Sequence, residues 1–344
     1  MRRRAPTSRL VTLAAVVAVL VSAASCGGDG DGGSSPSATP PSAASPTARP
    51  ALRELARVEV GGEPIGIVAA FDSVWVVNSE FDSGGDPSVS RIDPVTATVE
   101  ATIPVGAVPL EVVDAFGSIW VSNSEDDTVS RIDPATNEVV ATVKSCEAPE
   151  GMAADDTGLW VVCEESAAVA RIDPSTNEAE RPIEVGLEPR FAIVAFDSLW
   201  VSNYLDSTIT RIDPATGDVL AEIATEFGPQ VMTEAAGGVW VSSVDSDALQ
   251  RVDPATDEAG VAIQTEALPD GLLAHDGALW VATDLGPVLQ RVDPATQEIT
   301  GSWVVSDQGA IAANQLVVEA AGALWFPLLD SSEVLKVEIP DSPG

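Results

Sequence analysis

The sequence contains few basic residues, and it has one histidine and one tyrosine. Lys and Arg together number 17, against 53 Asp and Glu, so the formal net charge is −36. Because proteins bind nucleic acid by neutralising its phosphates with Lys and Arg, this deficit excludes nucleic acid as a partner. The same negative charge opposes direct adsorption to an anionic lipid surface and favours solubility outside the cell.

Common catalytic motifs are also missing. The chain has no Gly-x-Ser-x-Gly, no Walker A loop and no His-Glu-x-x-His. Its only histidine, His275, lies in a His-Asp-Gly turn five residues before Trp280, and we interpret it as a surface residue. These absences argue against the enzyme classes that such motifs mark.

Tryptophan, by contrast, recurs at a nearly constant spacing. Seven tryptophans lie in Leu/Val/Ile-Trp-Val/Phe triplets, 40 or 45 residues apart: Trp75, Trp120, Trp160, Trp200, Trp240, Trp280 and Trp325. An Arg-Ile/Val-Asp-Pro motif starts at Arg91, Arg131, Arg171, Arg211, Arg251 and Arg291, with a degenerate copy at Lys336. A strand-rich repeat of about 40 residues is the signature of a β-propeller, and seven copies predict seven blades.

The third repeat shows how one blade is expected to fold. Residues 151–154, 158–163, 168–173 and 179–185 read as four antiparallel strands, with turn residues between the last two. The chain ends without a fourth strand for the last blade, whereas residues 55–62 form a spare strand before the first blade. We therefore predict an all-β, seven-bladed propeller in which the N-terminal strand closes the last blade.

The N-terminus is expected to target the protein to the membrane. Four arginines precede an apolar run at residues 10–21, and the small residues before Cys26 are similar to the lipobox of bacterial lipoproteins. This predicts a signal peptide at 1–26 with lipidated Cys26, a disordered Gly/Ser/Pro tether at 27–50 and the propeller at 51–344. Ordinary secretion with cleavage after Ala24 is the alternative. We expect a monomer held at the extracytoplasmic face of the cell membrane by its lipid anchor only.

The two remaining cysteines are expected to pair. Cys146 precedes the first strand of the third repeat and Cys163 follows its second strand, so both lie on the same rim. In an exported protein such a pair favours a disulfide. A metal–thiolate pair is the alternative, although no histidine or second cysteine pair accompanies them.

Function in a repeat protein is expected where the copies differ. The position ten residues before each tryptophan, at one mouth of the channel, is occupied by Ile65, Leu110, Glu150, Arg190, Gln230, Asp270 and Gln315. We name the polar members, together with Tyr204 of the same blade as Arg190, as candidate ligand-binding residues. The alternative is that a wet channel mouth tolerates any residue.

Other features are expected on the same rim. The loops after the second strands bring Asn78, Asn123 and Asn203, and insertions at 81–86 and 306–313 would form one raised patch. Acidic residues make this rim negative: Asp82, Asp86, Glu125, Asp126, Asp127, Asp245 and Asp247. Their oxygens suit Ca²⁺ or Mg²⁺, but no full calcium-loop pattern occurs, so no cofactor is predicted.

Over residues 55–339 the repeat resembles the YVTN and streptogramin-lyase-like (virginiamycin B lyase-like) group of propellers. The motifs that carry the resemblance are Gly-Ala-Leu-Trp (277–280 and 322–325) and Arg-Ile-Asp-Pro-Ala-Thr-Gly (211–217). For the lyases, the resemblance implies a histidine after the proline of the innermost strand and an acid after the tryptophan strand, with a divalent metal. Neither residue type is present in this chain at those positions.

Three functions remain for such a domain. One is a surface-anchored binding module for a protein, cell-wall or small-molecule ligand, acting through the polar mouth. The second is a metal-dependent lyase or hydrolase of the streptogramin B lyase type, built on Glu150, Asp270 and Arg190. The third is a quinone-dependent dehydrogenase, supported only by architecture. We favour the binding module and regard enzymatic activity as undecided.

Overall fold

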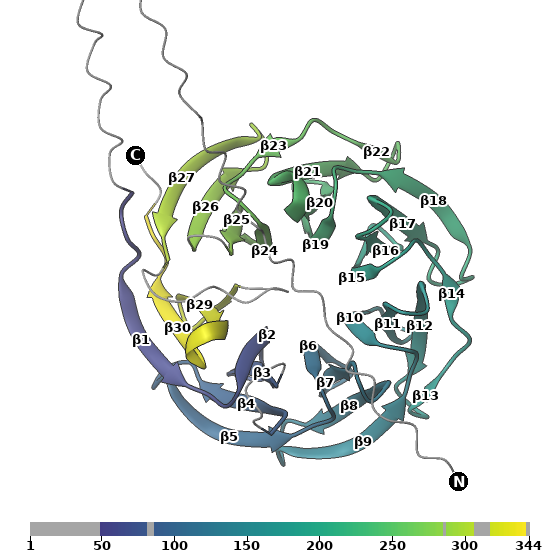
Figure 1. Ribbon diagram of the computed structural model, residues 1–344, viewed down its shortest axis with the longest axis horizontal. Coiled ribbons are helices and arrows are strands. Elements are labelled where there is room, and N and C mark those ends of the chain that lie inside the picture. Colours follow the sequence, from purple (N-terminus) through teal and green to yellow (C-terminus); the bar gives the residue numbers. More distant parts are fainter. Residues whose placement is uncertain (1–48, 81–85, 285–286, 306–316, 342–344) are drawn as a thin grey trace, which may run out of the picture. The chain divides into compact units, whose positions relative to one another are not determined.

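The computed structural model describes residues 49–80, 86–284, 287–305 and 317–341. These residues form seven antiparallel sheets, which stand as blades in a ring around a central channel (Figure 1). In each blade the first strand lies innermost and the fourth lies at the circumference. The predicted all-β, seven-bladed propeller is therefore confirmed.

The first three blades follow one another directly along the chain. Blade 1 consists of β2 (Glu63–Ala70), β3 (Ser73–Ser79), β4 (Ser88–Asp93) and β5 (Thr98–Pro104). Blade 2 consists of β6 (Pro109–Ala115), β7 (Ser118–Asn123), β8 (Thr128–Asp133) and β9 (Glu138–Lys144). Blade 3 consists of β10 (Pro149–Ala154), β11 (Leu159–Cys163), β12 (Ala168–Asp173), β13 (Glu178–Ala179) and β14 (Ile183–Glu184).

The next three blades repeat this order. Blade 4 consists of β15 (Pro189–Ala195), β16 (Ser198–Asn203), β17 (Thr208–Ile212) and β18 (Val219–Ala224). Blade 5 consists of β19 (Pro229–Ala235), β20 (Gly238–Ser243), β21 (Ala248–Asp253), β22 (Glu258–Ala259) and β23 (Ile263–Gln264). Blade 6 consists of β24 (Pro269–His275), β25 (Ala278–Thr283), β26 (Val288–Asp293) and β27 (Glu298–Val304).

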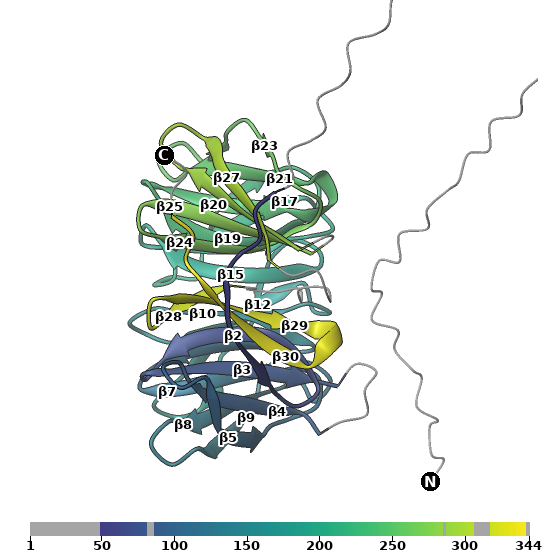
Figure 2. The ribbon, with the colours of Figure 1, turned by 90° about the vertical axis from the view of Figure 1, so that its left-hand side faces the viewer.

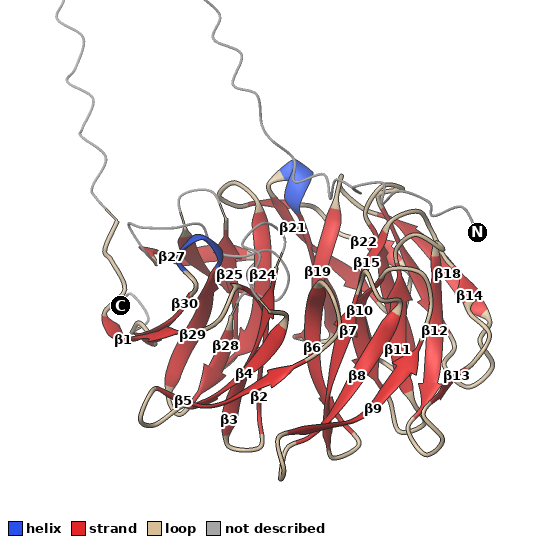
Figure 3. Cartoon of the chain, turned by 60° about the horizontal axis from the view of Figure 1, so that its bottom comes forward, coloured by secondary structure: helices blue, strands red, loops and turns tan. Residues whose placement is uncertain are grey.

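Blade 7 is built from both ends of the propeller sequence. It consists of β28 (Val318–Ala320), β29 (Ala323–Leu328), β30 (Glu333–Glu338) and β1 (Glu54–Glu59). Two 3₁₀ helices, η1 (Val244–Ser246) and η2 (Leu329–Ser331), follow the second strands of blades 5 and 7. Figure 3 shows both helices on one rim of the ring, which is also the rim where the innermost strands begin.

The prediction of a continuous fourth strand at 179–185 is wrong. In blade 3 this strand is split into β13 and β14, and Pro182, which lacks an N–H group, lies in the break. Blade 5 has the same interruption between β22 and β23, beginning at Gly260. Glycine weakens an edge strand because it has no side chain to pack. Both breaks therefore fall at residues that support strand pairing poorly.

The N-terminal strand completes the last blade, as predicted. β1 pairs antiparallel with β30 from Glu54 opposite Val337 to Glu59 opposite Glu333 (Figure 2). Just before β1, Ala51 forms a parallel bridge with Val304 of blade 6, and buried Leu52 belongs to the same apolar cluster as Trp303. The segment that leads into the propeller is thus fastened to two neighbouring blades.

The repeated tryptophans are core residues. All seven are at most 3% exposed. In six of them the indole N–H donates to the residue five positions earlier, for example from Trp75 to the Ala70 carbonyl at 3.0 Å. Burial of a large ring with a satisfied N–H group is the usual structural role of tryptophan, so these side chains hold the blades together.

Three of the repeated arginines link one blade to the next. Arg131 of blade 2 stacks over Trp120, and its Nε donates a hydrogen bond to Ser118 Oγ. Its Nη1 donates to the Pro174 carbonyl and to Asn177 Oδ1 of blade 3, at 2.7 and 3.0 Å. Arg91 and Arg211 make the equivalent contacts with blades 2 and 5. The aspartate of the motif accepts hydrogen bonds from N–H groups of the following turn; for example, the Ala135 N–H donates to Asp133 Oδ1 at 2.8 Å. In blades 1, 2 and 4 the motif is therefore an inter-blade clamp.

Candidate functional site

The residues of the predicted polar ring lie at the starts of the innermost strands. In the first six blades each directly follows a proline, which opens the strand in blades 2 to 6 and is its second residue in blade 1. Ile65 and Leu110 are buried apolar residues, and Glu150, Gln230 and Asp270 are 4%, 8% and 7% exposed. Gln315 lies outside the described residues. The ring is therefore largely buried, and only Arg190 of its described polar members is partly exposed.

Arg190 is the centre of an ion-pair network. Its Nη1 lies 3.1 and 3.2 Å from the two carboxylate oxygens of Glu150, which comes from the preceding blade. Its Nη2 lies 3.1 Å from Glu164 Oε1 and 3.4 Å from Glu188 Oε2. The Glu150 carboxylate, together with those of Glu164 and Glu188, raises the pKa of Arg190 above its ordinary value, against the opposing effect of burial. One guanidinium is thus shared by three carboxylates.

Tyr204 belongs to the same network. The guanidinium carbon of Arg190 lies 5.4 Å from the centroid of its ring, in cation–π geometry. Burial and a hydrogen bond to Asp245 raise the pKa of Tyr204 to about 12. The predicted proximity of Arg190 and Tyr204 is therefore what the structure shows, and the tyrosine stays neutral.

A fourth carboxyl group, Glu111, is present beside this network, and the sequence analysis missed it. Glu111 follows the ring position of blade 2, is 2% exposed, and its Oε1 has no hydrogen-bond partner among the described residues. Burial, with a smaller contribution from Glu150, raises its pKa well above the ordinary value. Blades 1 and 3 have glycine at this position, Gly66 and Gly151. A Cβ on either glycine would lie within 2.6 Å of the backbone of the innermost strand of the following blade, so the glycines allow that strand to approach closely. A carboxylate at a position where neighbouring repeats have glycine was therefore a sequence signal that could have identified Glu111.

The asparagines expected on this rim are structural residues. Asn78, Asn123 and Asn203 are fully buried. Each donates through Nδ2 to two hydroxyl groups of the third strand, as Asn123 does to Thr128 and Ser130, both at 3.0 Å. They were expected in the loops after the second strands, but they lie at or next to the ends of those strands, and their amides are engaged inside the blades.

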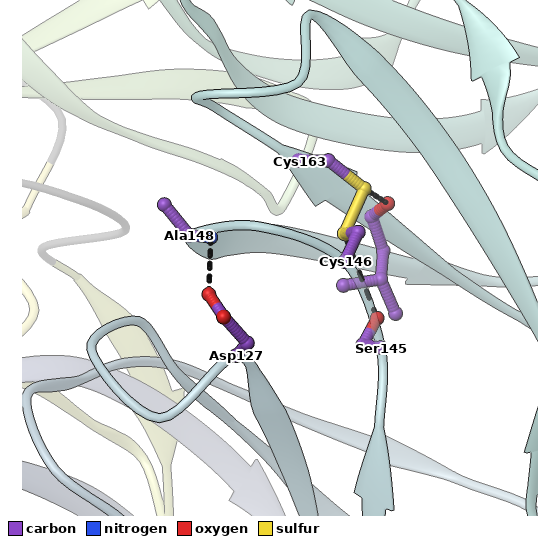
Figure 4. Close-up of a disulfide and its surroundings, with 6 residues drawn as sticks. Asp127, Ser145, Cys146, Ala148 and Cys163 are labelled. Carbon is purple, nitrogen blue, oxygen red and sulfur yellow. Dashed lines mark hydrogen bonds between the residues drawn. A yellow bond between two sulfur atoms is a disulfide. The ribbon is translucent and has the colours of Figure 1, made fainter. Parts of the chain in front are cut away.

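The structure joins Cys146 and Cys163 by a disulfide, with 5.7 Å between their Cα atoms (Figure 4). Cys163 ends β11 at the position that holds Asn123 in blade 2, and Cys146 occupies the position of Gly106. In blade 2 the Gly106 N–H donates to Asn123 Oδ1 at 3.1 Å. The disulfide thus replaces a hydrogen bond that fastens the entry loop of a blade.

The acidic side chains on this rim mostly brace loops. Asp127 accepts from the Ala148 N–H at 3.1 Å (Figure 4), and Asp247 accepts from the Leu268 N–H at 2.9 Å. Among the described residues, no group of three or more His, Cys, Asp and Glu side chains could hold a metal ion. Asp82, with the rest of residues 81–85 of the first insertion, and the insertion at 306–313 lie outside the described residues.

The positions that the family resemblance assigns to catalysis do not hold the residue types of the lyases, since the ring positions after the prolines have no histidine among the described residues. The residues three positions after the tryptophans are fully buried and include no acid: Asn78, Asn123, Cys163, Asn203, Ser243, Thr283 and Leu328. His275 ends β24 at the opposite rim, as predicted for a turn residue. The described part of the chain also contains no helix with the length and apolar character needed to span a bilayer.

No family model matches this chain, and no curated protein matches it. Solved structures do. A streptogramin B lyase structure has a TM-score of 0.69 at 15% identity, over 84% of this chain and 97% of the other. Kuenenia stuttgartiensis hydrazine synthase has a TM-score of 0.66 at 13% identity, over 81% and 96%.

The computationally designed Ika8 protein has a TM-score of 0.60 at 11% identity, over 83% of this chain and 99% of that one. At such identities the similarity establishes a shared fold and leaves activity open. This chain is therefore a seven-bladed β-propeller with the fold of the streptogramin B lyase structure.

Proposed function

We propose that this protein is a binding module, anchored to the extracytoplasmic face of the cell membrane by a lipid on Cys26, and that it binds a positively charged ligand at the polar mouth. The observation that carries the proposal is the sharing of Arg190 among Glu150, Glu164 and Glu188. An arginine that is already paired three times has little capacity left for an anion. The surplus carboxylates favour a cation instead.

The charge of the whole chain supports the same ligand class. A net charge of −36 attracts cations over long range and raises the rate at which they reach an acidic mouth. Lysine-rich protein segments and cell-wall peptides with free amino groups are ligands of this chemistry. Burial of the network strengthens each charge interaction, because water screens it less.

The test uses the full chain with Cys26→Ala, so that lipid does not interfere. A lysine-rich peptide, a glutamine-substituted peptide of the same length and an amine-bearing cell-wall peptide are titrated by calorimetry at low and high salt. We expect the two cationic peptides alone to bind, and binding to weaken as salt rises. Glu188→Gln should weaken it, whereas Glu125→Gln, an exposed rim change, serves as the matched control. Equal binding of the neutral peptide would refute the proposal.

Anchoring is tested separately on native cells. Mass spectrometry of the N-terminal fragment should show an acylated Cys26, and Cys26→Ala should release the protein from the membrane fraction. An unmodified mature protein that starts at Ser25 would instead establish simple secretion.

A metal-dependent lyase or hydrolase related to streptogramin B lyase is the second candidate. It is supported by the shared fold and by the buried carboxyls of Glu111 and Glu150, one of which has a raised pKa suited to proton transfer. Incubation with a cyclic depsipeptide, with Mg²⁺ or with chelator, followed by mass spectrometry of the product, decides it. Metal-dependent ring opening that Glu150→Gln abolishes would replace the binding role.

A further inference from the structure

The central channel has an apolar lining below its polar mouth. Seven residues before each tryptophan, and directly opposite it in the hairpin, the innermost strands carry Val68, Val113, Ala153, Ile193, Thr233, Leu273 and Val318. Six of the seven are apolar. Most are only partly buried although they lie in the interior of the ring, so they border open space. Water in such a channel gains few hydrogen bonds from its walls.

A cavity of about 350 Å³ occupies the side of the channel formed by blades 4 to 7. Its walls include Phe191, Ile193, Val231, Met232, Leu272 and Leu273. The polar side chains among its described walls are Thr233 and Glu234. This volume lies within the range of small-molecule sites, which combine apolar walls with few polar groups.

Glu234 lies one residue before the end of β19, at the opposite end of the strand from Gln230 of the polar ring. Asp114 and Glu319 occupy the same position in blades 2 and 7, so this second mouth is acidic at three places. An apolar cavity beside a carboxylate at its exit is complementary to a molecule with an apolar body and one positive charge.

The turns on this second rim expose aromatic side chains. Phe71 and Phe116 are 40% and 37% exposed, and both have left-handed backbone angles, with φ of 52° and 51°. A bulky residue is unfavourable in that conformation, where asparagine or glycine is preferred. An exposed phenylalanine at such a position therefore costs stability and adds apolar surface to this rim.

We propose that the channel binds a small apolar cation through the second mouth, with the apolar body in the cavity and the charge beside Glu234. This site is separate from the polar mouth and does not depend on the function proposed above. Its ligand class is an amine with an aromatic or aliphatic body of a size that a 350 Å³ cavity admits.

Three naphthalene probes of nearly equal size test the proposal on the full chain with Cys26→Ala. They are 1-naphthylmethylamine, 1-naphthylmethanol and 1-naphthoate, which are cationic, neutral and anionic at pH 7. Calorimetric titration should give the affinity order cation, alcohol, anion. Glu234→Gln should reduce the affinity for the amine about two- to fivefold and leave the alcohol unchanged.

Filling the cavity should abolish the site. Leu273→Trp is expected to lower the affinity for both the amine and the alcohol at least tenfold, and Ile193→Trp does the same from the neighbouring blade if the first variant fails to fold. Leu220→Trp, on an exposed outer strand, is the matched control and should bind as the parent does. Unchanged binding in a folded cavity-filling variant, or no binding of any probe at millimolar concentration, would overturn the proposal. Loss of peptide binding at the polar mouth is a separate result and does not bear on it.

Discussion

Lys336 Nζ donates to the carbonyl oxygen of Pro94 at 2.7 Å, across the seam between the last and the first blade. Lys336 stands where the six other blades have the arginine of the repeated motif, and it also lies over Trp325. An ammonium group cannot match the forked donors of a guanidinium, so one hydrogen bond replaces the two made by Arg131. The degenerate copy of the motif therefore still performs the clamp function where the ring closes.

The closing strand predicts a sharp effect of N-terminal truncation. A chain that starts at residue 49 keeps β1 and should unfold as the full chain does. A chain that starts at residue 60 loses the pairing with β30 and the buried side chains of Leu52 and Val58. We expect it to lose about 3–6 kcal/mol of unfolding free energy, measured by denaturant titration. Equal stability of the two chains would contradict the closure described above.

Two arginines at equivalent positions should differ in their contribution. Arg131→Ala removes two hydrogen bonds to blade 3 and a cation–π contact, and should cost about 2–4 kcal/mol. Arg171 instead donates to Thr157 and Glu180 of its own blade. Arg171→Ala should cost about 0–1 kcal/mol in the same urea titration. Equal losses would show that the inter-blade contact contributes nothing.

The disulfide can be compared with the hydrogen bond that it replaces. Cys146→Ala with Cys163→Ala should lower the unfolding free energy by about 3 kcal/mol, as expected for a loop of this length. Cys146→Gly with Cys163→Asn installs the pair found in blade 2 and should recover about 1 kcal/mol of that loss. Thermal unfolding under non-reducing conditions measures both. No difference between the two double variants would mean that the Gly–Asn contact is not transferable.

Stability should fall as pH rises above the ordinary pKa of glutamate. Burial raises the pKa of Glu111, so the folded chain holds a proton that the unfolded chain releases near pH 4.3. The unfolding free energy therefore decreases from about pH 4.3 up to the folded pKa. Burial acts in the same direction on Glu164, and it raises the pKa of Asp284 to about 6.

Replacing the buried acid should reduce this dependence. Glu111→Gln cannot ionise, so its stability curve between pH 4.5 and 8 should be flatter than that of the parent, with a gain at the upper end. Glu125→Gln, on the exposed rim, should leave the curve unchanged. Denaturant titrations at several pH values give the comparison. Parallel curves for Glu111→Gln and the parent would show that Glu111 ionises in the folded state without cost.

Much of the fold follows from local sequence patterns. The spacing of the tryptophans, the turn residues after each Arg-Ile/Val-Asp-Pro motif and the spare N-terminal strand determine seven blades and their closure, because each signal repeats and acts within one hairpin or between neighbours. The pairing of Cys146 with Cys163 follows from the same register. Pro182 and Gly260 were weaker signals for the breaks in the fourth strands, because the pairing of an edge strand depends on only a few backbone groups.

The chemistry of the channel was decided by tertiary structure. The sequence placed Glu150 and Arg190 on one rim, but it could not show that Glu164 and Glu188 converge on the same guanidinium. Nor could it show that Glu111 Oε1 is buried without a hydrogen-bond partner among the described residues. These contacts join residues of different blades and loops, so their distances depend on how the sheets pack around the axis. Burial then sets the pKa values and the free volume, and both are properties of the assembled ring rather than of any single repeat.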